Sequence, residues 1–161
     1  MQKIYTKKFP EVKQLNYWER IKSLKMLSQE RRMERYRCIY IWKIMEGLVP
    51  NCGVEVTSSD MRGREAKVPQ NKGSGRVSSL REASFQVHAP KLFNSLPLKI
   101  RNLTKIGIDD FKFKLDKYLE ILPDVPKIGE YCPSVYNQNS GKPSNSIIDH
   151  ARTINLRRHG H

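Results

Sequence analysis

The sequence has no long apolar run and only three cysteines. No stretch approaches the ~20 apolar residues that a membrane-spanning helix needs, and the start, MQKIYTKKFPEVKQ, lacks the apolar core of a secretory signal. Cys38, Cys52 and Cys132 are far apart, with no Cys-x-x-Cys pair, so they specify neither a disulfide framework nor a zinc ribbon. We therefore expect an intracellular protein, nuclear or cytoplasmic. We also expect no membrane binding, because the apolar faces of the basic helices are needed for the core.

Acidic residues are few relative to basic ones. The 161 residues include 30 Lys and Arg but only 16 Asp and Glu, which gives a net charge of +14. Half of this excess falls in residues 1–46, which carry 12 basic and 5 acidic groups. A balance this basic favours a polyanionic partner, and we expect nucleic acid, either RNA or DNA. The length predicts one compact domain with tails.

Apolar periodicity predicts a mainly α-helical fold. Asn16 and Glu19 have the spacing of a capping box, which predicts a helix that begins at Asn16. Ser28 is expected to cap a second helix that extends to about Glu46 and stops at Gly47. The apolar stripe of this second helix is expected from residues at three- and four-residue steps: Met33, Tyr36, Tyr40 and Ile44.

The periodicity fades after residue 50 and returns near residue 90. Residues 51–84 are rich in glycine and are predicted to form a basic loop. Within and beside it, residues 62–68 and 84–88 are expected to pair as a short β-hairpin. A short helical turn is expected at 89–96, and Asp109 is expected to cap a third helix. One face of that helix is expected to be apolar: Phe111, Leu115, Tyr118, Leu119 and Leu122.

The chain therefore divides into four predicted segments. They are a basic two-helix segment (1–50), the glycine-rich loop with its hairpin (51–84), the helical turn with the third helix (85–126) and a disordered C-terminal tail (127–161). The tail is rich in Pro, Ser, Asn and Gly, and its only periodic feature is a weak amphipathic turn after Ser146.

The stretch QERRMERYRCIYIW is the clearest candidate for contact with nucleic acid. On a helical wheel Arg31, Arg35 and Trp42 share a face opposite the expected apolar stripe. Guanidinium groups bind phosphates and an exposed indole stacks on bases, so this face could follow a nucleic-acid strand. The alternative is that glutamates pair with the arginines on a solvated face while Trp42 packs against another helix. The predicted nucleic-acid-binding residues are Arg31, Arg32, Arg35, Trp42 and Lys43 in this stretch and Arg62, Arg64, Lys67 and Arg76 in the glycine-rich loop.

Catalytic and metal-binding patterns are weak. Asp109 and Asp110 are adjacent, as in the metal-binding pair of a polymerase, but no Tyr or Phe stands two residues before them and helix capping explains them. The cysteines and His150 lack the spacing of metal ligands. We therefore expect no catalytic residue, no metal and no cofactor.

Five short boxes follow one another along the chain. They are LNYWER at 15–20, LSQERRMERY at 27–36, YIWKIMEG at 40–47, FNSLP at 93–97 and FKFKLDK at 111–117. In sequence, order and spacing they resemble the region downstream of the polymerase core in jockey-like, LINE-type non-LTR retrotransposon reverse transcriptases. Phe93 stands where that family typically has Trp, which is a mild aromatic change.

The resemblance covers roughly residues 4–126 and implies a thumb-side segment that lies near template RNA and target DNA. The family's endonuclease, fingers and palm, with the Tyr/Phe-x-Asp-Asp catalytic box, lie upstream of this stretch. The resemblance therefore implies a non-catalytic fragment of an RNA-directed DNA polymerase that binds nucleic acid electrostatically. Three alternatives stay open: a segment that packs against the upstream polymerase domain, or its relic; a recruited protein-interaction module; and an unrecognised enzyme.

Overall fold

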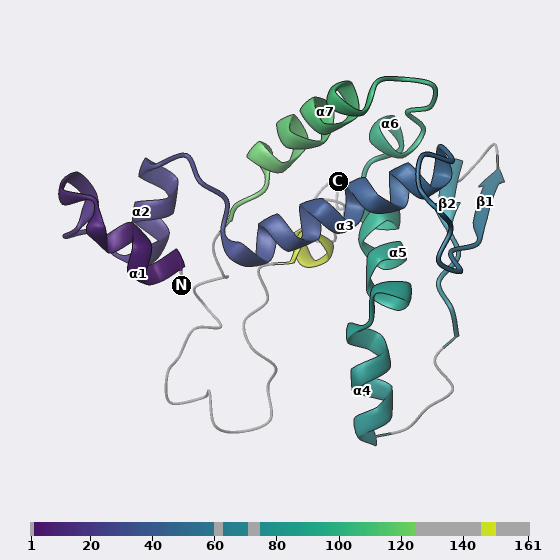
Figure 1. Ribbon diagram of the computed structural model, residues 1–161, viewed down its shortest axis with the longest axis horizontal. Coiled ribbons are helices and arrows are strands. Elements are labelled where there is room, and N and C mark those ends of the chain that lie inside the picture. The colour runs from purple at the N-terminus through teal and green to yellow at the C-terminus, as the bar shows by residue number, and fades with distance from the viewer. Residues whose placement is uncertain (1, 60–62, 71–74, 125–145, 151–161) are drawn as a thin grey trace, which may run out of the picture.

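The computed structural model describes residues 2–59, 63–70, 75–124 and 146–150, and these are mainly helical (Figure 1). The helices are α1 (Gln2–Tyr5), η1 (Thr6–Lys8), η2 (Pro10–Val12), α2 (Tyr17–Ser23), α3 (Gln29–Met45), α4 (Gly75–Ala83), α5 (Phe85–Ser95), α6 (Leu98–Arg101) and α7 (Ile108–Ile121). Strands β1 (Val56–Ser59) and β2 (Gly63–Ala66) pair antiparallel, with Val56 opposite Ala66. The predicted mainly α fold with a short β-hairpin is confirmed.

The predicted caps of the first two long helices are confirmed. The Asn16 side chain accepts hydrogen bonds from the backbone N–H groups of Trp18 and Glu19, and the Glu19 carboxylate accepts one from the Asn16 N–H, which completes the capping box. The Ser28 hydroxyl accepts from the Arg31 N–H at the start of α3. Helix α3 ends before Gly47, whose φ of +70° is a conformation that favours glycine.

Helix α3 runs through the middle of the molecule, with α7 packed alongside it and α5 packed across it (Figure 1). Trp42 near its C-terminal end meets Phe111 at the start of α7, while Ser28 at its N-terminal end meets Asp124 just after α7, so the two helices run antiparallel. The buried core lies among these three helices. Its largest apolar members are Ile41, Trp42, Leu92, Phe93, Phe111, Leu115 and Ile147.

The predicted orientation of α3 is wrong. Of the expected stripe only Ile44 is buried; Met33, Tyr36 and Tyr40 are 48%, 56% and 39% exposed. The buried face is instead the one that carries Cys38, Ile41 and Trp42 further along the helix and Arg31 and Glu34 nearer its start. Because two charged residues lie on the buried face, its sequence reads as polar.

The predicted hairpin pairing is also wrong. Strand β2 pairs with β1 and not with residues 84–88, which lead into α5. Gly63 opens β2 with a φ of +66°, and a Cβ there would collide with the Asn102 side chain, so glycine is needed at this close approach. Helix α5 begins earlier than predicted, at Phe85, and α4 forms where a loop was expected.

The third long helix agrees with its predicted face. Phe111, Leu115, Leu119 and Leu122 are buried and Tyr118 is partly buried. The helix begins one residue before Asp109, with Gly107 as its cap. The apolar face of α7 was therefore predicted correctly, although the capping residue was not.

The amphipathic turn expected after Ser146 is present, but it belongs to the core and not to a disordered tail. Residues 147–150 form a helical turn, and Ile147 is fully buried in the core. Glu34 holds the start of this turn, because its carboxylate accepts hydrogen bonds from the Ser146 hydroxyl at 2.6 Å and the Ile147 N–H at 2.8 Å. Burial raises the pKa of Glu34, while these two hydrogen bonds oppose the rise. Residues 125–145 and 151–161 of the predicted tail lie outside the described residues.

Candidate nucleic-acid interface

Residues 2–27 form a small lobe at one end of the molecule, which we call the basic lobe (Figure 1). Arg20 lies inside it and is only 4% exposed. Its guanidinium donates hydrogen bonds to the Thr6 hydroxyl at 3.2 Å, to the Leu15 carbonyl at 2.5 Å and to the Lys3 carbonyl at 3.4 Å. Arg20 therefore ties the short helices of the lobe together and is not available to an external anion.

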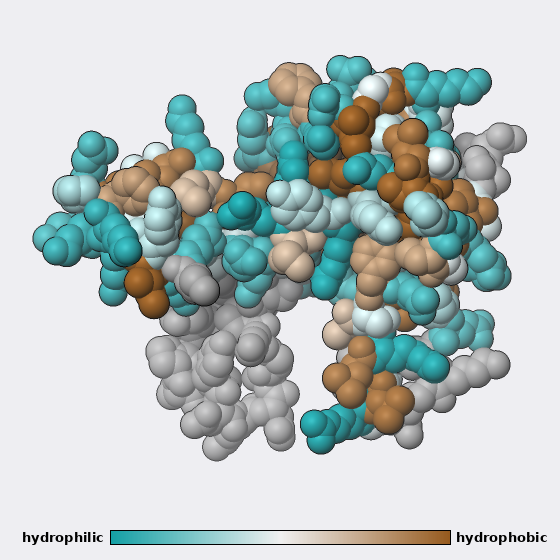
Figure 2. Space-filling model, in the orientation of Figure 1, coloured by the Kyte–Doolittle hydropathy of each residue, from teal (hydrophilic) through white to brown (hydrophobic). Residues whose placement is uncertain are grey.

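The other cations of the basic lobe are at its surface. Its exposed lysines are Lys3, Lys7, Lys8, Lys13, Lys22 and Lys25. Among the described residues none of them forms an ion pair with a carboxylate, and the acidic residues of the lobe are Glu11 and Glu19. Figure 2 shows hydrophilic side chains along the rim of this lobe. The lobe therefore presents a strongly positive surface.

Aromatic rings accompany these lysines. Tyr5 and Phe9 are 57% and 38% exposed, and their rings meet edge to face with centroids 5.5 Å apart. Tyr17 and Trp18 form a second edge-to-face pair at 4.8 Å and are partly buried. Exposed aromatic rings beside free cations are the combination that binds single nucleic-acid strands.

A groove joins the basic lobe to the central helices, and we call it the Arg32 groove. It has a volume of about 370 Å³ and is lined by Met26, Leu27, Arg32, Arg35, Tyr36 and Asp116. Arg35 is held in place by Asp116, since its Nε and one Nη donate to the two carboxylate oxygens at 2.5 and 2.7 Å. This hydrogen bonding raises the pKa of Arg35. Arg32 is exposed and no ion pair with a carboxylate is found for it in the described part of the chain.

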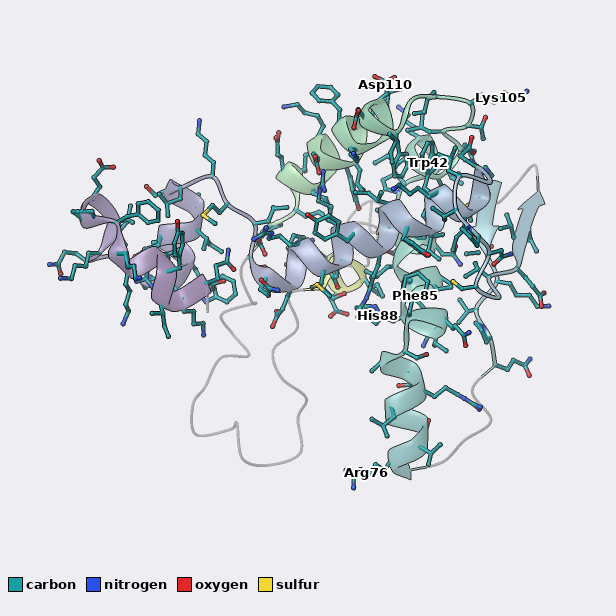
Figure 3. The ribbon with its side chains drawn as sticks, viewed as in Figure 1. Trp42, Arg76, Phe85, His88, Lys105 and Asp110 are labelled. Atoms are coloured by element: carbon teal, nitrogen blue, oxygen red, sulfur yellow. The ribbon has the colours of Figure 1, made fainter. Side chains whose placement is uncertain are left out.

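The structure places two of the predicted binding residues in the interior. Trp42 is fully buried, its ring is stacked on Phe111, and its indole N–H donates to the Leu103 carbonyl at 2.8 Å (Figure 3). Arg31 is also fully buried and donates to the Pro123 carbonyl at 2.9 Å. The predicted exposed face of Arg31, Arg35 and Trp42 is therefore wrong. Of the alternative, the packing of Trp42 against another helix is confirmed, but the pairing of glutamates with the arginines is wrong, because Arg31 and Arg35 pair with Asp124 and Asp116.

Arg64 also has a structural environment. One of its Nη atoms lies 2.7 Å from a Glu46 carboxylate oxygen and the other donates to the Leu103 carbonyl at 3.0 Å. The Leu103 carbonyl thus accepts from both Trp42 and Arg64, which joins α3 and β2 to the loop before α7. Arg64 is therefore positioned to hold the hairpin against the core.

The remaining predicted residues are closer to solvent. Lys43 is partly buried, and Lys67 is exposed and paired with Glu55 at 2.5 Å. Arg76 is exposed at the free end of α4 (Figure 3). Arg62 lies outside the described residues. Among the five residues predicted in α3, Arg32 alone is both exposed and at the groove.

Sequence reasoning missed the lysines of the basic lobe and Tyr36. The charge count had already pointed to residues 1–46, but the helical wheel was applied to α3, which directed attention away from residues 2–25. Tyr36 was assigned to the apolar stripe because its hydrophobic neighbours at three- and four-residue steps suggested burial. Only the packing of α5 and α7 on the opposite face shows that this side of α3 is exposed.

Comparisons with protein-family models, with curated proteins and with solved structures found no match. Within the described residues, no group of three or more His, Cys, Asp and Glu side chains could hold a metal ion. The described helices also include none with the length and apolar character to span a bilayer.

Proposed function

We propose that this chain is a non-catalytic segment of a retrotransposon reverse transcriptase that binds nucleic acid through the basic lobe and Arg32. The observation that carries the proposal is the concentration of free cations there. Residues 2–32 hold nine basic and three acidic residues, and the six lysines of the lobe and Arg32 are all exposed. Clustered Lys and Arg bind a phosphate backbone through release of its counterions.

The family part of the proposal is supported by the contacts that residues of four of the five boxes make. Trp42 of the YIWKIMEG box stacks on Phe111 of the FKFKLDK box. Arg35 of the LSQERRMERY box pairs with Asp116 of the same FKFKLDK box. Asn94 of the FNSLP box hydrogen-bonds the backbone of Ala66 in the hairpin. Residues of these four boxes thus help to hold the central helices and the hairpin together.

Charge reversal in the lobe tests the binding proposal. A Lys7→Glu/Lys8→Glu variant of the full chain should weaken binding to a fluorescent oligonucleotide and flatten its salt dependence. The slope of log K against log salt should fall in magnitude by about 0.7 to 0.9 for each phosphate that the variant no longer binds. The matched control is Lys99→Glu/Lys114→Glu, which makes the same change in net charge at exposed positions of α6 and α7. If both variants bind with the same reduced affinity, the lobe is not the interface.

A second candidate function is packing against the upstream polymerase domain. It is favoured by large apolar side chains that stay exposed on α4 and α7: Val77 64%, Leu80 67%, Phe113 62% and Ile121 73%. The α4 residues form a hydrophobic surface in Figure 2. A Val77→Ser/Leu80→Ser variant should then lose affinity for the purified polymerase segment while its affinity for nucleic acid is unchanged. Unchanged affinity for both would contradict the packing function.

A further inference from the structure

We infer that the Arg32 groove binds an unpaired nucleobase, so that the nucleic acid recognised by this chain is single-stranded. The inference rests on the proposed function and adds the class of strand and the place where a base is held. The inference is based on two residues that line the same groove: Arg32, for which no ion pair is found in the described residues, and Tyr36, whose side chain is exposed.

The groove has a volume and lining residues that suit a nucleobase. Its volume of about 370 Å³ lies within the range of small-molecule sites, about 300–1,000 Å³. Met26 and Leu27 provide apolar walls on the side of the lobe, and Tyr36 provides a ring that is 56% exposed. A base that enters therefore finds an aromatic face to stack on and apolar side chains at its edges.

The ring of Tyr36 lies beside its neighbour Arg35. The Arg35 guanidinium lies 5.8 Å from the centroid of that ring, and Arg35 itself is fixed by its two hydrogen bonds to Asp116. A cation–π contact of this kind favours this position of Tyr36 before a base binds. Asp116 neutralises the charge of Arg35. A phosphate in the groove would therefore bind to the guanidinium of Arg32.

This arrangement suits an unpaired base and not a duplex. In a duplex both faces of each base are covered by its neighbours in the stack, so a ring in a groove cannot reach them without extruding the base. A single strand can place a base on Tyr36 while its backbone continues past Lys25, which directly precedes Met26, toward the lysines of the lobe. Stacking of this kind tolerates any base, and RNA and DNA strands offer the same chemistry.

Fluorescence anisotropy on the full chain tests the inference with three probes: a 12-nucleotide RNA, the DNA strand of the same sequence, and the corresponding DNA duplex. We expect tighter binding of the single strands than of the duplex. Tyr36→Ala should weaken single-strand binding about tenfold with the salt slope unchanged, since stacking releases no counterions. Tyr36→Phe should bind like the wild type. Phe113→Ala is the matched control, because it removes a ring that is 62% exposed outside the groove.

The possible results separate the inference from the proposed function. Equal affinity for the duplex and the single strands, or equal effects of Tyr36→Ala and Phe113→Ala, would overturn the inference and leave electrostatic binding by the lobe in place. A wild-type chain, folded by circular dichroism, that binds none of the three probes would overturn the proposed function as well. Similar affinity for the RNA and DNA strands, both tighter than for the duplex, would support the inference, since the two strands offer the same stacking chemistry.

Discussion

Trp42 lies parallel to Phe111, with an angle of 11° between the ring planes and 4.5 Å between their centroids. This stacking joins the C-terminal end of α3 to the start of α7, and the Leu103 carbonyl fixes the indole through a 2.8 Å hydrogen bond. Trp42, which was expected to stack on bases at the surface, thus stabilises the core. The exposed rings suited to stacking are instead Tyr5, Phe9 and Tyr36.

Substitution of Trp42 should affect stability first. Trp42→Ala is expected to lower the free energy of unfolding by about 3–5 kcal/mol, because it leaves a cavity against Phe111. Trp42→Phe should cost less, since a ring still packs there and Arg64 continues to donate to the Leu103 carbonyl. Urea denaturation followed by circular dichroism measures both changes. A Trp42→Ala chain as stable as the wild type would show that Trp42 is not a core residue.

Arg35 and Asp116 should be energetically coupled. Their bidentate pairing links α3 to α7, with side chains 18% and 39% exposed, so solvent screens it in part. A double-mutant cycle with Arg35→Ala and Asp116→Ala should give a coupling energy of about 1 kcal/mol in urea denaturation. Lys117 and Glu120 supply the comparison, since that exposed pair within α7 should couple more weakly. Equal coupling in the two pairs would contradict a special role for Arg35.

Asn94 should be needed for docking of the hairpin. Its side-chain oxygen accepts from the Ala66 N–H at 2.9 Å and its NH₂ group donates to the Ala66 carbonyl at 2.8 Å. Asn94→Asp keeps the acceptor but faces the carbonyl with a carboxylate oxygen, so we expect a decrease of about 1–3 kcal/mol in the free energy of unfolding. Asn102→Ala, which removes one exposed acceptor at the other end of β2, should cost less. The reverse order in thermal or urea unfolding would show that the Asn94 hydrogen bonds are dispensable.

His88 should make stability depend on pH. Arg37 donates to its Nδ1 at 3.0 Å, which requires an unprotonated nitrogen, and burial, followed by Arg37 and Lys91, lowers the pKa of His88 below 6.5. The unfolded chain therefore binds a proton more readily, and the stability that His88 contributes is present above pH 6.5 and is lost as the pH falls below that value. Urea denaturation at pH 7.5 and at pH 5 should show a larger decrease in stability for the wild type than for His88→Gln. Equal decreases would mean that His88 titrates as it does in the unfolded chain.

Several elements of the fold could be predicted from local signals in the sequence. The Asn16–Glu19 box, the Ser28 cap and the apolar face of α7 were predicted because each is decided by residues within one or two turns. Helix α4 was missed because Gly75 and its serines resemble a loop. The strand partner of β2 was assigned to the wrong segment because alternation alone does not choose between neighbours.

Less of the candidate site than of the fold could be predicted from the sequence. Helix α3 has apolar residues on two faces. The face that is buried begins with Arg31 and Glu34. The partners of these two residues, Asp124 and Ser146, lie more than 90 residues away in the sequence. No local pattern reveals such partners, so Trp42 was assigned to the surface and Tyr36 to the core. The charge excess of residues 1–46 includes the lysines of the basic lobe, on which the proposed interface rests.

Photo-crosslinking tests most directly whether the basic lobe and the Arg32 groove form the nucleic-acid interface. The full chain would be irradiated with a single-stranded RNA that carries 4-thiouridine, and the crosslinked peptides would be identified by mass spectrometry. We predict crosslinks in residues 2–36, at Tyr5, Phe9 and Tyr36 in particular, which disappear as salt is raised. Crosslinks confined to α4 or α7, with none in residues 2–36, would contradict this interface.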